Sequence, residues 1–118
     1  MIAPCEPSDE KYFCPVAKTL SIIGGKWTLL ILRDLSGGTK RFGQLQKSLQ
    51  GISPKTLSQR LRELEKEEIV VKKVYAEVPP RVEYSLTSRG ESLKKIVHAL
   101  AEWGTEHPGK KTGKSIFD

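Results

Sequence analysis

The spacing of the apolar residues changes from helical to alternating after the acidic stretch "EKEE". In "RVEYSL", Val82, Tyr84 and Leu86 share one face, and polar or charged residues share the other. The preceding "IVVKKVY" is rich in β-branched residues, and the prolines of "AEVPP" between the two segments forbid one continuous strand. The pattern therefore predicts a series of helices followed by an antiparallel hairpin with a long tip.

Helical spacing and cap residues predict five helices, four before the hairpin and one after it. Glycine pairs separate the first three, and a proline at the first helical position favours two of the starts. The expected elements are a helix from Cys14-Pro15 to Ile23, a central helix at Lys26–Ser36, a helix at Arg41–Leu49 capped by Thr39, a helix at Ser53–Glu67, and a helix that opens with a Ser88/Glu91 capping box and runs to Trp103.

Length and charge limit the class of protein. The 118 residues predict one domain, and an apolar share of 37% predicts a core small enough for a second subunit to help bury surface. A formal net charge of +6 favours a polyanionic partner. The expected organisation is an arm over residues 1–13, a domain over 14–104 and a loose basic tail over 105–118.

Several classes of function are disfavoured by what the sequence lacks. No apolar run approaches the roughly 18 residues of a membrane span, and the N-terminus does not resemble a signal peptide, so a cytoplasmic protein is expected. Cys5 and Cys14 have no ligand-like spacing to His98 or His107, so we expect no metal site. We also expect no cofactor and no enzymatic activity, because no nucleophile, acid–base or phosphate-loop constellation is apparent.

The two helices around Gly51 predict a helix-turn-helix, and the hairpin that follows makes it a winged one. The overall class is α+β, mostly α, with a two-stranded wing. Leu57, Leu61 and Leu64 form the buried stripe of the second helix, Ser53 caps it, and its first turn has no acidic residue. Such a surface can bind base edges and phosphates, although the same composition is also typical of an ordinary solvent-exposed helix face. The residues expected to face outward are Lys55, Thr56, Ser58, Gln59, Arg60, Arg62 and Glu63.

Three further cations are candidate contacts to DNA. Lys40 and Arg41, at the start of the preceding helix, are expected to bind phosphates, and Arg81 beside the hairpin prolines is a candidate wing contact. The alternative for all three is a solubilising surface charge. Lys72 and Lys73 are adjacent on a strand, so at most one of them faces the DNA.

The stretches "CPVAKTLSIIGGKWTLLIL", "KRFGQLQKSLQGISPKTLSQRLRELEKEEIV" and "RVEYSLTSRGESL" closely resemble the HxlR-type winged helix-turn-helix regulators of bacteria, relatives of the MarR group. The resemblance covers roughly Cys14 to Trp103. It implies a homodimer that binds a double-stranded, inverted-repeat operator and represses or activates nearby genes. It leaves the operator sequence and any small-molecule effector open. Dimerisation would use the N- and C-terminal helices, with the candidate residues Val16, Leu20, Ile96, Leu100 and Trp103.

In some members of that family a cysteine just before the first helix senses oxidants or electrophiles, and Cys14 falls at that position. A helix N-terminus favours the thiolate, which supports this role, whereas a cysteine that only packs or caps is the alternative. Cys5 is either a resolving thiol or idle, and pairing within or between chains stays open. A protein-docking module is the competing function for the domain, but the outward face of the Ser53 helix lacks the aromatic or methionine residues typical of one.

Overall fold

The structure is a computed structural model that describes residues 14–109; the expected arm over residues 1–13 and the end of the expected tail, residues 110–118, lie outside the described residues. The described elements follow the predicted order of helices, hairpin and C-terminal helix. They are α1 (Pro15–Ile23), α2 (Lys26–Ser36), β1 (Lys40–Arg41), α3 (Phe42–Ser48), α4 (Pro54–Lys66), β2 (Val70–Tyr75), β3 (Arg81–Leu86), α5 (Ser88–Glu91) and α6 (Lys94–Glu106).

Helix α2 is the centre of the core, as its apolar residues predict. It contacts α3, α4, α6 and β3, and its Ile31 and Leu32 are fully buried. The three leucines of the predicted α4 stripe, Leu57, Leu61 and Leu64, are also buried, because their spacing places them on one side of the helix. The predicted winged helix-turn-helix architecture is confirmed.

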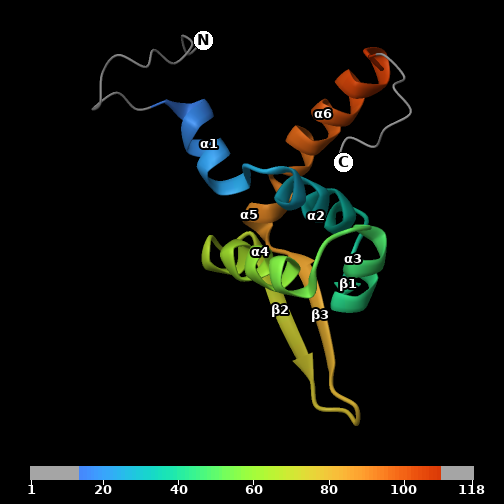
Figure 1. The fold of residues 1–118 in the computed structure, drawn as a ribbon. Helices are drawn as coiled ribbons and strands as arrows, with labels where there is room; N and C mark the ends of the chain where they lie inside the picture. The colour runs from blue at the N-terminus through green and yellow to red at the C-terminus, as the bar shows by residue number, and fades with distance from the viewer. Residues whose placement is uncertain (1–13, 110–118) are drawn as a thin grey trace.

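The hairpin pairs β2 with β3 in an antiparallel register in which Val70 faces Leu86 and Tyr75 faces Arg81. A third strand, β1, pairs with the other edge of β3, so the sheet order is β1-β3-β2 and the predicted two-stranded wing is part of a three-stranded sheet. In Figure 1 the tip of this hairpin lies at one end of the molecule, and α1 and α6 project from the other end.

Two predicted helix caps were wrong. Lys40 and Arg41 are extended because they pair with β3, so α3 begins after Arg41, whose backbone N–H donates to Gln44 Oε1 at 2.8 Å; Thr39 is not its cap. After the hairpin, Thr87 caps the helix instead of Ser88, because its Oγ1 accepts from the Gly90 N–H at 3.0 Å.

The predicted last helix is two helices, α5 and α6, and it ends three residues beyond the predicted Trp103. Helix α6 continues to Glu106, two residues into the predicted tail, and the backbone N–H of His107 still donates to the Trp103 carbonyl at 2.9 Å. Across residues 14–109, none of the helices is both long enough and apolar enough to cross a membrane.

Candidate nucleic-acid interface

Helices α3 and α4 form the helix-turn-helix, and the turn between them depends on Gly51. Its φ of 93° lies in the left-handed region that favours glycine. Immediately after it, the Ile52 N–H donates to the Leu49 carbonyl at 3.1 Å, and both side chains are buried. The turn is therefore anchored on the core, which fixes the direction in which α4 leaves it.

The start of α4 is capped as the sequence predicts. Ser53 Oγ accepts from the Thr56 N–H at 3.1 Å and donates to Thr56 Oγ1 at 2.9 Å, while Pro54 occupies the first helical position. No acidic residue lies in the first turn. The positive end of the helix dipole is therefore not neutralised by a side chain, which is the arrangement that attracts phosphate oxygens.

Opposite the buried leucines, Lys55 and Gln59 point outward and are exposed. On the side toward the wing, Ser58 and Arg62 line a hollow of about 340 Å³ together with Lys72 and Tyr84. Burial, and secondarily the charge of Glu65, raise the pKa of Tyr84. The structure thus brings Lys72 next to two predicted DNA contacts, a position that the alternation of the strand alone did not reveal.

Arg60 and Gln59 both bond to Glu63. The Arg60 guanidinium forms an ion pair with Glu63 Oε2 at 3.0 Å, and Gln59 Nε2 lies 3.4 Å from Glu63 Oε1. These residues are three and four positions apart, which is the spacing at which helical side chains meet. The same spacing is visible in the sequence and could have revealed this cluster, which the sequence analysis did not predict.

Lys40 and Arg41 lie on β1, opposite Tyr84 and Glu83 of β3, and not on a helix. Arg41 is exposed and lines a hollow of about 470 Å³ between the start of α3 and the wing tip, to which Arg81 also contributes. Two of the predicted DNA contacts, Arg41 and Arg81, are far apart in the sequence but share one concave surface beside the tip of the hairpin.

Arg81 is held by other residues of the wing. Its Nη1 lies 3.3 Å from Glu77 Oε1, its Nε lies 3.4 Å from Glu83 Oε2, and its guanidinium stacks 4.0 Å from the centre of the Tyr75 ring. Two carboxylates therefore balance its charge. To contact DNA, Arg81 must either use its remaining N–H donors or exchange these partners for phosphate or base oxygens.

Cys14 is the N-cap of α1, where its Sγ accepts from the Ala17 N–H at 3.3 Å. The sulfur takes part in a disulfide bond. Cys5, the other cysteine of the sequence, lies outside the described residues.

The predicted dimer contacts divide into two groups. Val16 and Leu20 on α1 and Leu100 and Trp103 on α6 expose between 52% and 63% of their surface. Ile96, in contrast, packs in part against the core of its own chain. The four exposed residues therefore lie on α1 and α6, the two helices that project from this end of the molecule (Figure 1).

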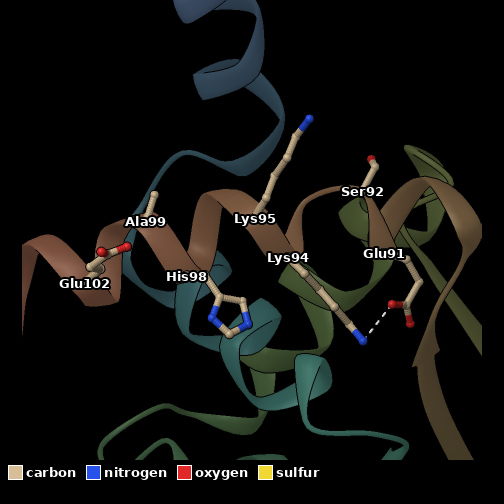
Figure 2. Close-up of a pocket in the computed structure, with 7 residues that line it drawn as sticks. All are labelled: Glu91, Ser92, Lys94, Lys95, His98, Ala99 and Glu102. Atoms are coloured by element: carbon tan, nitrogen blue, oxygen red, sulfur yellow. Dashed lines mark ion pairs between the residues drawn. The ribbon is translucent and has the colours of Figure 1, made fainter.

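Helix α6 also has a polar side, which borders a shallow hollow of about 590 Å³ (Figure 2). Charges of both signs line it, and Lys94 forms an ion pair with Glu91 at 2.6 Å. His98 lies in the same hollow. Within residues 14–109, no group of three or more His, Cys, Asp or Glu side chains is arranged to hold a metal ion.

Known proteins are similar to this chain in both sequence and fold. Residues 22–112 match the family model described as HxlR-like helix-turn-helix. YtcD of Bacillus subtilis, named as an HTH-type transcriptional regulator, is 42% identical over 107 residues, which are 91% of this chain and 85% of YtcD.

Two solved structures show the same similarity. The redox regulator HypR in its oxidised form matches with a TM-score of 0.78 at 41% identity, over 84% of this chain and 100% of HypR. A Porphyromonas gingivalis W83 protein assigned to the MarR family of transcriptional regulators matches with a TM-score of 0.79 at 44% identity, over 87% of this chain and 99% of that one. The chain described here therefore belongs to the HxlR-like helix-turn-helix family of DNA-binding transcriptional regulators.

Proposed function

We propose that the protein is a homodimer that binds an inverted-repeat operator in double-stranded DNA, with the N-terminal half of α4 in the major groove. The proposal rests on the composition of the outward face of α4 before Glu63. This face is polar or cationic and has no acidic residue, and three buried leucines on the opposite side pack the helix against the core. In a helix-turn-helix this half of the second helix contacts base edges.

Within this proposal the side chains divide by chemistry. Lys55, Gln59, Arg60 and Arg62 are the candidates for base edges, because their donors and acceptors give directional bonds in the major groove. Ser53, Thr56 and Ser58 bond bases or phosphates. Lys40 and Arg41 bind phosphates, and Arg81 contacts the minor groove or backbone from the wing.

The exposed apolar residues of α1 and α6 support the homodimer. Half-exposed leucine and tryptophan side chains gathered at one end of a small domain are typical of an interaction surface. A two-fold partner at that end would present two α4 helices about 34 Å apart, one turn of the duplex, which is why the operator should be an inverted repeat.

We further propose that disulfide formation at Cys14 controls DNA binding. The N-cap position supports this, since the dipole of α1 would stabilise the thiolate of the reduced residue, and so does the similarity to a redox regulator. Oxidation joins the sulfur of Cys14 to a second thiol, from Cys5 or from another copy of the chain. The two thiols lose two protons and two electrons, which the oxidant accepts.

Selection of bound duplexes from a random pool tests both parts of the proposal. Reduced protein should enrich an inverted repeat, and affinity for it should fall with salt at a log–log slope of about −0.9 per phosphate neutralised. No enrichment, or a flat salt response, would refute the DNA-binding mode. Diamide treatment should change the affinity of the wild type but not of Cys14→Ser; equal responses would refute the switch.

A further inference from the structure

Glu63 is the first acidic residue of α4, and it lies at the edge of the face proposed to enter the major groove. A carboxylate at this position repels phosphates. It also adds little to folding, because the pair with Arg60 is open to solvent, with 37% of the arginine and 51% of the glutamate side chain exposed. Its position thus points to a role in what α4 binds.

Glu63 contacts two of the side chains proposed to bind base edges, Gln59 and Arg60. Glu63 uses one carboxylate oxygen for Arg60 at 3.0 Å and directs the other toward Gln59 at 3.4 Å. A guanidinium has five N–H donors, so Arg60 can keep the bond from Nη1 and still offer other donors to a base. The carboxylate therefore restricts the rotamers of both side chains before DNA arrives.

The charge of the pair matters as much as its geometry. Together Arg60 and Glu63 have no net charge, so sequence-independent attraction to phosphates gains little from this arginine. A correctly placed guanine still gains its paired hydrogen bonds. Glu63 thereby weakens binding to arbitrary DNA more than binding to the operator.

We propose that Glu63 is a positioning residue that sets sequence discrimination by holding Arg60 and Gln59 for base contacts and by cancelling the charge of Arg60 toward phosphates. The inference rests on the proposed operator binding. It adds a residue that need not touch DNA itself but determines how strongly the protein distinguishes one sequence from another.

Glu63→Gln tests the inference, because it keeps the size of the side chain and removes its charge. Glu67→Gln is the matched control: it removes the same charge at the exposed C-cap residue of α4, one position after the helix ends. Each full-length protein is titrated with the selected operator and with a scrambled duplex of equal length over a series of salt concentrations. Thermal unfolding of each variant verifies that it is folded.

Glu63→Gln should tighten binding to the scrambled duplex, steepen its salt slope by about 0.9, and lower the ratio of the two affinities on the order of tenfold. Glu67→Gln should keep the wild-type ratio. In an Arg60→Ala background, Glu63→Gln should change the ratio far less, since the charge that it releases is gone.

If Glu63→Gln and Glu67→Gln had the same ratio of operator to scrambled-duplex affinity, the inference would be overturned. The proposed function would still stand in that case, provided that the wild type preferred the operator. If Glu63→Gln lowered the affinity ratio as much in the Arg60→Ala background as in the wild type, the claim that Glu63 acts through Arg60 would be refuted. If the wild type itself did not prefer its selected duplex, the proposed function would fail and this inference with it.

Discussion

A β-carbon added at Gly90 would lie 2.2 Å from the carbonyl oxygen of Ile69, closer than a real contact allows. The same carbonyl accepts from the backbone N–H of Thr87 at 3.0 Å, and the Thr87 hydroxyl bonds the neighbouring Glu68 carbonyl at 2.5 Å. The start of α5 is therefore packed directly on the backbone between α4 and β2. This contact holds the base of the wing against the end of the proposed recognition helix.

Gly90→Ala should lower the free energy of unfolding by about 1–3 kcal/mol, because backbone rather than a movable side chain blocks the added methyl group. Gly104→Ala is the control, since nothing lies within 4 Å of its β-carbon and it is inside α6. That change should stabilise by up to about 1 kcal/mol through helix propensity. Denaturant titration measures the free energy of unfolding of both variants. A change in the same direction in both would contradict the packing argument.

Glu68 ends α4 with a φ of 60°, a conformation that costs side-chain-bearing residues free energy. Its N–H donates to the Glu65 carbonyl at 3.0 Å, and the Ile69 N–H donates to the Leu64 carbonyl at 2.9 Å, as in a glycine-terminated helix. Glu68→Gly should therefore raise the free energy of unfolding by roughly 0.5–1 kcal/mol.

The matched control for that change is Glu67→Gly, at a residue whose φ is an ordinary −83°. There glycine only adds freedom to the unfolded chain, so the free energy of unfolding should fall by roughly 0.5–1 kcal/mol. Urea denaturation of the two variants compares them directly. A loss of stability in both would show that the left-handed turn is not strained.

Tyr84 should make the protein less stable in alkali. Burial raises its pKa, so the folded chain keeps the phenol proton to a higher pH than the unfolded chain does. This contribution to stability is complete below the ordinary pKa of about 10 and is lost as the pH rises through the folded-state pKa. When denaturation is measured at a series of alkaline pH values, the free energy of unfolding of Tyr84→Phe should fall less steeply with pH than that of the wild type. Identical pH dependence in the two proteins would exclude Tyr84 as the cause of the alkaline loss of stability.

Lys40→Ala and Gln59→Ala should weaken DNA binding in different ways. Lys40 is expected to bind phosphate, so its loss should reduce affinity for operator and scrambled DNA by the same factor and make the salt slope shallower by about 0.9. Gln59→Ala should instead weaken operator binding selectively, by about 1–3 kcal/mol if its contact is bidentate. Fluorescence anisotropy measures both. Lys95→Ala, on the polar side of α6, should change neither affinity (Figure 2).

Leu100→Asp should shift the proposed homodimer toward monomer, because it puts a charge on the apolar surface of α6 at Leu100, which is 52% exposed in the single chain. Sedimentation velocity at several protein concentrations measures the change. Val74→Asp on the wing, where the side chain is 61% exposed, is the control and should sediment like the wild type. A wild type that is monomeric throughout would contradict the proposed dimer.

The positions of the long helices and of the hairpin were predictable because their signals are local. The spacing of Leu57, Leu61 and Leu64 specifies a buried stripe, and Ser53-Pro54 marks a helix start, without reference to any distant residue. The alternation in Arg81–Leu86 specifies a strand in the same way. These patterns were sufficient for the winged helix-turn-helix and for the face of α4.

The contacts between segments that are distant in the sequence were decided only in the tertiary structure. Lys40 and Arg41 form a strand because β3 offers them backbone partners, and two residues have no periodicity of their own. Thr87 rather than Ser88 caps α5 because the end of β3 holds it beside Ile69. Likewise, Lys72 joins Ser58 and Arg62 in one hollow only after β2 packs on α4. Local sequence determined the elements, and the pairing of their edges and surfaces determined which charged side chains came together.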